Sequence, residues 1–200
     1  MKIAIIDYGS GNVGSVKNAL NYLGVQSILT SDKNEIKTAD KIILPGQGRF
    51  GDVMNKLKQK GLDKILVQEL KKGKPYLGIC IGLQILFDKS EENPGVKGLG
   101  IIKGDVKKFK INQKVPQIGW NQAEQNKESV LFNKLNKKNY YFVHSYYVEP
   151  IDKSVTLAQT GYGIEFVSAI EINNLFAVQF HPEKSGKIGL QLLKIFCEVI

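Results

Sequence analysis

A cysteine between two glycines, and a histidine two positions before a glutamate, are the residues whose types and spacing suit chemistry. Cys80 lies in Gly78-Ile79-Cys80-Ile81-Gly82, after a short apolar run and before a helical pattern. Small residues on both sides of a possible nucleophile are typical of the sharp strand-to-helix turn called a nucleophile elbow. At such a turn the helix dipole favours a thiolate, and the N–H of Ile81 would face a developing oxyanion.

His181 follows the apolar run 176–180 and precedes Pro182, which favours extended backbone at the preceding residue. Because residues two apart on an extended chain face the same side, Glu183 can reach the imidazole. A carboxylate on Nδ1 fixes the tautomer and stabilises the imidazolium that forms when the ring takes a proton. Cys80, His181 and Glu183 are therefore predicted to be the nucleophile, the base and the orienting group of a cysteine-dependent amide hydrolase.

Two other segments could contribute to such a site. His144 is the only other histidine, and its nearest following carboxylate, Glu149, is five positions away, so we expect a structural or substrate-contact role for it. The glycines of Leu44-Pro45-Gly46-Gln47-Gly48 allow a main-chain N–H to turn toward a ligand. That loop is either a second oxyanion donor or an ordinary turn.

A glycine-rich segment near the N-terminus imitates a cofactor-binding motif. Gly9-Ser10-Gly11-Asn12-Val13-Gly14 follows an apolar run, and Asp32 lies eighteen residues further on, close to the dinucleotide fingerprint. However, Asp7 and Tyr8 separate the apolar run from the first glycine, and no later segment supplies a hydride-transfer site. We therefore expect no cofactor.

Composition narrows the class of protein. The chain has 200 residues and 42% hydrophobic content, which suit one globular domain over residues 1–200. It has no run of about 18 apolar residues and begins without the basic-then-apolar order of a signal peptide, so we expect a cytoplasmic protein with no membrane partner. Cys80 and Cys197 lack the spacing of metal ligands, so we expect no metal and a core position for Cys197.

The net charge of +9 could suggest nucleic-acid binding. Arg49 is the single arginine, however, and the lysines are scattered along the chain. Nucleic-acid recognition favours arginine forks and clustered basic stripes. We therefore expect no nucleic-acid partner.

Apolar runs alternate with helical patterns in the first half of the chain. Strands are predicted at 2–7, 25–30, 41–44 and 75–80, and helices at 13–23, at 50–72 with a break at Gly61, and from 82 to about 88. In the second half, strands are predicted at 101–110, 140–148, 155–160, 167–172 and 176–180, before a closing helix at 186–199.

The predicted fold class is α/β, doubly wound, with a mainly parallel central sheet, helices on both faces and an added antiparallel β region in the second half. Ligands of such sheets bind beyond the carboxyl ends of the strands. The loops that begin at Asp7, Pro45, Cys80 and His181 should therefore share one rim of the sheet.

Together these segments resemble the class I, or triad, glutamine amidotransferases. The elbow at 78–82 with Gln84, the Pro45-Gly46-x-Gly48 loop and His181-Pro182-Glu183 carry that resemblance. Four further segments are similar to the family of glutaminase subunits of imidazole glycerol phosphate synthase, from histidine biosynthesis: 7–12, 116–121, 141–146 and 179–185. The similarity runs from residue 3 to the C-terminal helix.

The resemblance implies roles for the site residues. Cys80 would attack the side-chain amide of L-glutamine to form a thioester, and His181 would protonate the departing ammonia. Ile81 and the peptide between Gly46 and Gln47 would donate to the oxyanion. Six positions match those that hold glutamine in the family: Gly48, Gln84, Glu92, His144, Ser145 and Tyr146.

The resemblance also implies a protein partner, a (β/α)8-barrel cyclase subunit that receives the ammonia within a heterodimer. Because the glutaminase similarity occupies the whole chain, we expect the ammonia-consuming step to belong to that second protein. Asn12, Trp120, Tyr141 and Lys184 would line the face toward it.

One loop departs from the family pattern. This chain has Gln47 where the family usually has an apolar residue, and Arg49 follows Gly48. Because the oxyanion donor is a main-chain N–H, the chemistry should be retained. The conformational switching of the loop and its contacts with the partner subunit could differ. Three alternatives stay open: a paralogue that feeds ammonia to an amidino-sugar synthase, another cysteine hydrolase such as a γ-glutamyl peptidase, and a non-catalytic scaffold that docks a barrel.

Overall fold

Four short strands of the N-terminal half form a parallel sheet. In the computed structural model, which describes residues 1–9 and 13–200, they are β1 (Ile3–Ile6), β2 (Ser27–Thr30), β3 (Lys41–Leu44) and β4 (Tyr76–Ile79). They lie in the order β2-β1-β3-β4, and each neighbouring pair is parallel. The predicted parallel sheet is confirmed, and the residues that follow its strands share one edge.

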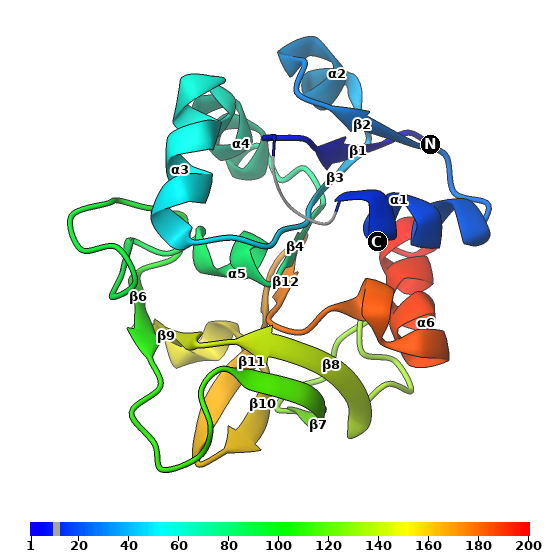
Figure 1. The fold of residues 1–200 in the computed structure, drawn as a ribbon. Coiled ribbons are helices and arrows are strands. Elements are labelled where there is room, and N and C mark those ends of the chain that lie inside the picture. Colours follow the sequence, from blue (N-terminus) through cyan, green and yellow to red (C-terminus); the bar gives the residue numbers. More distant parts are fainter. Residues whose placement is uncertain (10–12) are drawn as a thin grey trace.

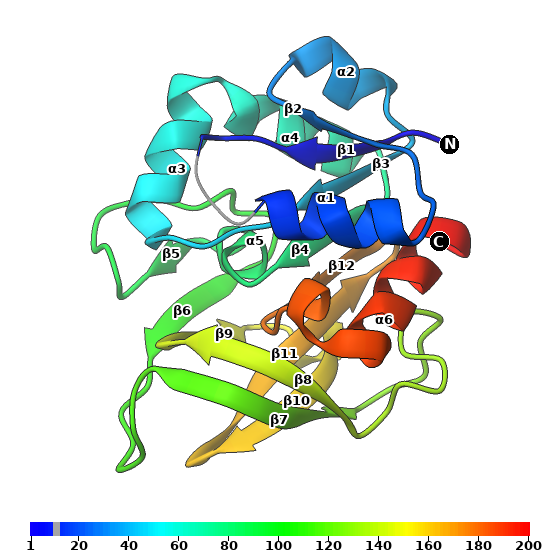
Figure 2. The ribbon, with the colours of Figure 1, turned by 45° about the vertical axis from the view of Figure 1, so that its right-hand side comes forward.

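Helices cover both faces of this sheet (Figures 1 and 2). One face carries α1 (Val13–Tyr22) and α6 (Gly186–Glu198), and the other carries α3 (Phe50–Gln59) and α4 (Leu62–Lys71), separated at Gly61 as predicted. Alternate strand residues supply the two cores: Ile43 packs in the cluster of Leu20, and Ile42 in that of Leu57. None of the helices in the described residues has the length and apolar character that a membrane crossing needs.

The second half extends the sheet with antiparallel strands, as predicted. β12 (Leu175–Val178) lies parallel to β4, and β11 (Ile164–Ile172), β10 (Thr156–Tyr162), β7 (Gln117–Gln125) and β8 (Lys138–His144) follow in antiparallel order. A branch of β5 (Lys89–Ser90), β6 (Gly104–Lys108) and β9 (Tyr146–Pro150) joins through β11, and the short 3-10 helix η1 (Lys153–Val155) precedes β10. In the described residues these strands form one 12-stranded sheet.

Several elements had no sequence prediction, among them one helix and one long strand. Helix α2 (Lys33–Thr38) is short, and Asp32 caps it by accepting hydrogen bonds from the N–H groups of Asn34 and Glu35. Asp32, which completed the near match to the dinucleotide fingerprint, therefore caps a helix. Strand β7 escaped prediction because its polar residues and Gly119 dilute the apolar alternation that identifies a strand.

The strand predicted at 140–148 is wrong as a single element. β8 ends at His144 and β9 begins at Tyr146, because β8 pairs with β7 whereas β9 pairs with β6. The change of partner bends the chain at Ser145. Apolar periodicity continues across this bend, so the sequence pattern did not reveal it.

The helix predicted from 82 to about 88 is also too long. Helix α5 covers only Ile81–Gln84. The carbonyls of Ile85 and Leu86 accept hydrogen bonds from the N–H groups of Leu99 and Ile101. These bonds to a distant loop replace those that would continue the helix.

The second cysteine lies in the core, as predicted. Cys197 on α6 is fully buried, and burial raises the pKa of its thiol to about 12. The Nζ of Lys41 donates to the carbonyls of Phe196 and Cys197 at 2.9 and 2.5 Å. A cation at a helix C-terminus satisfies free carbonyls and complements the dipole, so this pair closes α6.

The turn at Cys80 has the geometry of an elbow and leaves no room beside it. A β-carbon on Gly78 would meet the carbonyl oxygen of Gly82, and one on Gly82 would overlap the carbonyl of Leu44. Cys80 itself has a φ of 54°, which non-glycine residues rarely adopt. The two glycines are therefore required by close backbone approach.

We predict that Gly82→Ala lowers the free energy of unfolding by about 2–4 kcal/mol, because the new methyl group overlaps backbone that cannot move aside. The matched control is Gly14→Ala on the exposed side of α1, where nothing lies within 4 Å. That change should stabilise by about 0.5–1 kcal/mol through helix propensity. Urea unfolding measures both, and equal effects would contradict the steric explanation.

Candidate active site

Two distant parts of the sequence meet where β4 and β12 end. The strands are parallel neighbours, with Val178 opposite Ile79, and the N–H of Cys80 donates to the Val178 carbonyl at 2.7 Å. Cys80 begins the turn after β4, and His181 lies three residues beyond the end of β12. The sheet therefore brings the predicted nucleophile and base to one edge.

His181 and Glu183 form a buried pair. Nδ1 of His181 is 2.8 Å from Oε1 of Glu183, and the two side chains are only 1% and 2% exposed. His181 is extended as predicted, but Glu183 lies in the 3-10 helix η2 (Pro182–Lys184). The predicted contact is confirmed, and the extended path predicted for it is wrong, because a 3-10 turn brings the carboxylate back to the ring.

The backbone of His181 is fixed against β8. Its N–H donates to the carbonyl of Tyr141 at 2.8 Å, and its carbonyl accepts from the hydroxyl of Ser185 at 2.6 Å. The same hydroxyl accepts from the N–H of Tyr141 at 2.9 Å. Three hydrogen bonds thus set the position of the imidazole before any ligand binds.

The surroundings of His181 favour its protonated form. Burial opposes the charge, but interactions with Cys80 and then with Glu183 outweigh it and raise the pKa of His181 to about 10. Nε2 is buried and, within the described chain, makes no hydrogen bond of ordinary geometry. Because Nδ1 is held by Glu183, Nε2 is the nitrogen left to exchange a proton with the Cys80 thiol.

A pocket of about 360 Å³ opens beside Cys80, within the size range of small-molecule sites. Cys80 lines this pocket and is 8% exposed. All six residues predicted to hold glutamine line this pocket, and Val143 was not predicted: the lining is Gln47, Gly48, Cys80, Ile81, Gln84, Glu92, Val143, His144, Ser145 and Tyr146.

The predicted oxyanion donors lie next to this pocket. Ile81 is the first residue of α5, so its N–H has no partner inside the helix. Gly46 is buried behind it and so close that a β-carbon would overlap the Ile81 side chain. Gln47 is exposed and lines the same pocket as Cys80.

His144 is neutral in the folded chain at pH 7. Its Nδ1 donates to the carbonyl of Tyr146 at 2.8 Å, and its Nε2 lies 2.8 Å from the side-chain amide of Gln117. Burial is the largest effect, and with repulsion from His181 it lowers the pKa of His144 to about 4 despite the Tyr146 bond. This agrees with the structural or substrate-contact role expected for it.

Glu92 is attached to the other side of the pocket. Its Oε2 accepts from the N–H of Phe50 at 2.7 Å, and the neighbouring Asn93 accepts from Gly51 at 2.9 Å. Both bonds satisfy free N–H groups at the start of α3. The helix therefore holds the carboxylate beside the pocket.

Sequence analysis gave no role to Gln179, which contacts the predicted nucleophile. This residue is fully buried just beyond β12, and its Nε2 donates to Sγ of Cys80 at 3.5 Å. A signal was present in the sequence, because Gln179 is the one polar residue in the apolar run 176–180. Buried amides require partners, and this one faces the thiol.

An exposed aromatic face lies next to the His181 loop. Trp120 on β7 is 59% exposed and stands opposite Tyr141 on β8, with their ring centroids 6.1 Å apart. Ile118, two residues before Trp120, is also exposed and was not predicted. Lys184 lies in η2 and is partly exposed. Asn12, the fourth residue predicted to face a partner, is outside the described residues.

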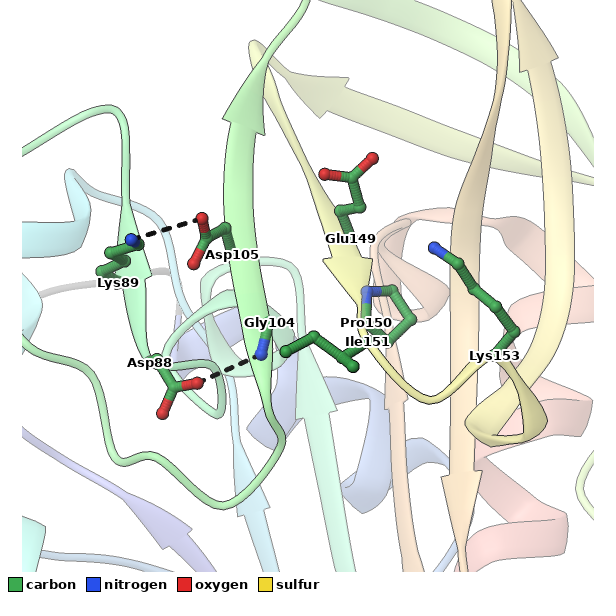
Figure 3. Close-up of a pocket in the computed structure, with 8 residues that line it drawn as sticks. All are labelled: Asp88, Lys89, Gly104, Asp105, Glu149, Pro150, Ile151 and Lys153. Atoms are coloured by element: carbon green, nitrogen blue, oxygen red, sulfur yellow. Dashed lines mark hydrogen bonds and ion pairs between the residues drawn. The ribbon is translucent and has the colours of Figure 1, made fainter.

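A second hollow lies beside β6 and β9 and holds several carboxylates (Figure 3). Two of its three carboxylates have cationic partners: Lys103 lies 2.9 Å from Asp88, and Lys89 lies 3.6 Å from Asp105. In the described residues, no cluster of histidine, cysteine, aspartate and glutamate could hold a metal ion. We assign no function to this hollow.

Comparison with known proteins identifies the family. The family model described as glutamine amidotransferase class-I matches residues 4–198. The chain belongs to this family. It is 48% identical to the imidazole glycerol phosphate synthase subunit HisH of Methanothermobacter thermautotrophicus, over 99% of this chain and 98% of that protein. It is also 48% identical to the subunit of the same name from Aquifex aeolicus, over 98% and 96% of the two chains.

Solved structures agree on the fold. A crystal structure of a glutamine amidotransferase superposes with a TM-score of 0.77 at 18% identity, covering 97% of this chain and 98% of that one. PurLQS from Thermotoga maritima also gives 0.77, at 19% identity and 98% and 96% coverage. The amidotransferase fold is thus retained at low sequence identity, and this chain is an enzyme of that class.

We predict that His144 makes the folded chain acid-sensitive. Its pKa is about 4 folded against 6.5 for an ordinary histidine, so below pH 6.5 the unfolded chain binds a proton that the folded chain excludes. The free energy of unfolding should fall by about 1 kcal/mol between pH 6 and 5. The raised pKa of His181 adds only a small opposing slope there, because that ring is mostly protonated in both states below pH 6.

The matched variant is His144→Gln, which keeps every carboxylate of the chain and removes this titration. Its unfolding free energy, from urea denaturation at each pH, should change less over the same interval. Identical slopes for the two proteins would show that another group causes the acid sensitivity.

Proposed function

We propose that this chain is the glutaminase subunit of an imidazole glycerol phosphate synthase in histidine biosynthesis. It hydrolyses L-glutamine to glutamate and ammonia, and the ammonia passes to a (β/α)8-barrel cyclase subunit. The observation that carries the proposed chemistry is the buried His181–Glu183 pair. Nδ1 of His181 is held by Glu183, so its Nε2 is left to exchange a proton with the Cys80 thiol, which lines the pocket. Relatives that are 48% identical over nearly the full length are named as subunits of imidazole glycerol phosphate synthase. Their name supports the cyclase as the subunit that receives the ammonia.

In the first step, Sγ of Cys80, whose proton has passed to Nε2 of His181, attacks the side-chain amide carbon of glutamine. A carbon–sulfur bond forms while the carbonyl electrons move onto oxygen. Glu183 stabilises the imidazolium through Nδ1 at 2.8 Å. The raised pKa of His181 favours this proton transfer.

In the second step, the oxyanion collapses and the carbon–nitrogen bond breaks. His181 returns its proton to the departing nitrogen, so that ammonia leaves and a γ-glutamyl thioester remains on Cys80. Water then attacks the thioester carbon and gives a proton to His181. The carbon–sulfur bond breaks, glutamate leaves, and the proton returns to the thiol.

The oxyanion receives hydrogen bonds from main-chain N–H groups of Ile81 and of the Gly46–Gln47 peptide. Preorganised donors at this position typically contribute about 10²–10³ in rate each. Gly48, Gln84, Glu92 and the His144–Tyr146 bend hold the amino-acid end of the substrate. These residues that hold the amino-acid end all line the same pocket.

The exposed face of Ile118, Trp120 and Tyr141 docks the cyclase subunit. Exposed aromatic residues that are grouped on one face are typical of protein interfaces, where they contribute most of the binding energy. The face adjoins the site, because the Tyr141 carbonyl holds the N–H of His181 at 2.8 Å. Docking there would cover the path by which ammonia leaves Cys80, so that ammonia reaches the cyclase subunit without meeting bulk water.

We predict that Cys80→Ala abolishes glutamine hydrolysis, lowering kcat at least about 10³-fold, because no other group supplies the nucleophile. The matched control is Cys197→Ala, which removes the other thiol from the core of α6 and should keep kcat within about threefold. Glutamate release is measured with the cyclase subunit and its ribonucleotide substrate present. Equal glutamate release by Cys80→Ala and the unmodified chain would show that Cys80 is not the nucleophile.

We also predict that Trp120→Ala weakens binding of the cyclase subunit about 10–100-fold, as expected for a central interface aromatic. Tyr22→Ala is the matched control, since that tyrosine is 80% exposed at the far end of α1. Isothermal titration with the purified cyclase subunit gives both affinities. A Trp120→Ala protein that binds as well as the control would remove this face from the interface.

A paralogue that serves an amidino-sugar synthase is the second candidate, favoured by the exposed Gln47 and Arg49 beside the pocket. Affinity purification of the chain from its own cells, followed by mass spectrometry, separates the two. Recovery of the histidine-pathway cyclase supports the main proposal, and recovery of a sugar-modifying synthase replaces it.

A further inference from the structure

A row of buried amides connects the nucleophile to the pocket wall. Gln179 is fully buried, and its Nε2 donates to Sγ of Cys80 at 3.5 Å. Its Oε1 accepts from Nε2 of Gln84 at 3.0 Å, and the same Nε2 donates to the carbonyl of Tyr146 at 3.2 Å. The row therefore runs from the Tyr146 backbone through two side-chain amides to the thiol.

The direction of these hydrogen bonds is fixed by the backbone. The Tyr146 carbonyl can only accept, so Gln84 must present its NH₂ group to it. That NH₂ group then donates its second hydrogen to Gln179, which must present its oxygen. As a result the NH₂ group of Gln179 faces Cys80. Neither amide can turn over without losing a buried hydrogen bond.

We propose that Gln179 is a positioning residue that holds the Cys80 thiolate and sets its orientation toward the pocket. An N–H donor bonds a sulfur anion more strongly than a neutral thiol, and burial strengthens the difference. Gln179 thus complements His181 by stabilising the anion that remains once the proton has moved. It takes no proton and makes no contact with the pocket itself.

The same row couples the substrate contact to the nucleophile. Both N–H bonds of Gln84 are used inside the protein, so its oxygen is the polar atom left for a ligand in the pocket. A ligand that moves Gln84 would therefore also disturb the amide that holds Cys80. This inference rests on Cys80 being the nucleophile of the proposed function.

The test measures the thiolate directly, without glutamine. The rate at which iodoacetamide alkylates Cys80 is followed against pH in the full chain, by mass spectrometry of the peptide that contains it. Cys197 is fully buried and is counted separately. Gln179→Met keeps the length of the side chain and removes the donor. Its alkylation midpoint should lie about one pH unit higher than in the unmodified chain.

The matched control is Ser168→Ala on β11. Ser168 is fully buried beside Gln179, whose N–H donates to its carbonyl at 2.9 Å, and within the described residues its hydroxyl has no hydrogen-bond partner. Its alkylation midpoint should be unchanged. A folded Gln179→Met protein with the same midpoint as this control would overturn the proposal, because a merely structural role would leave the titration of Cys80 in place.

A second variant protects the test against misfolding of Gln179→Met. Gln179→Glu keeps the shape and replaces the donor with a carboxyl group, whose negative charge repels a thiolate. Its midpoint should also rise by about one pH unit or more, and an unchanged or lower midpoint would overturn the proposal. If Cys80→Ala instead retained glutamine hydrolysis, the proposed function would fail while the alkylation result stayed valid.

Discussion

The whole site depends on one sharp turn, at which Cys80 has a φ of 54° and a ψ of −105°. Holding a non-glycine residue in such a conformation costs about 1–3 kcal/mol, so the surroundings must enforce it. The N–H of Cys80 is bonded to β12, and the hydroxyl of Tyr76 donates to the Gly82 carbonyl at 2.8 Å. Strand and helix on either side of the turn are thereby fixed, and the thiol has one direction available to it.

The order of strands determines what that thiol meets. β12 is inserted beside β4 although about a hundred residues separate them in sequence, so His181 arrives at the edge where Cys80 turns. β12 also begins the antiparallel half of the sheet, whose strand β8 holds the His181 backbone through Tyr141. The parallel half thus supplies the proposed nucleophile, and the antiparallel half supplies part of the pocket wall and the support of the proposed base.

Much of the fold and of the candidate site could be predicted from the sequence, wherever a residue's chemistry and its local sequence pattern point to the same role. Cys80, His181 and Glu183 each have neighbours that suit their roles, and the short apolar strands of the first half identified the parallel sheet. The bend at Ser145 could not be predicted, because it arises where β8 pairs with β7 and β9 pairs with β6. Strand pairing depends on distant parts of the chain and leaves no local sequence pattern. Gln179 was missed for a related reason: its place inside an apolar run indicates burial, whereas its contact with the thiol depends on the spacing of two strands.

The two histidines show how one neighbourhood can hold opposite charge states. His181 has an acidic partner at 2.8 Å and a thiol beyond it, and these raise its pKa. His144 is bonded to a carbonyl and an amide, neither of which offsets the loss of water, and its pKa falls. Since the charge of His181 lowers the pKa of His144 further, a protonated His181 favours a neutral His144 at the pocket wall. The positive charge is therefore confined to the ring beside Cys80, where it would stabilise the sulfur anion of the proposed mechanism.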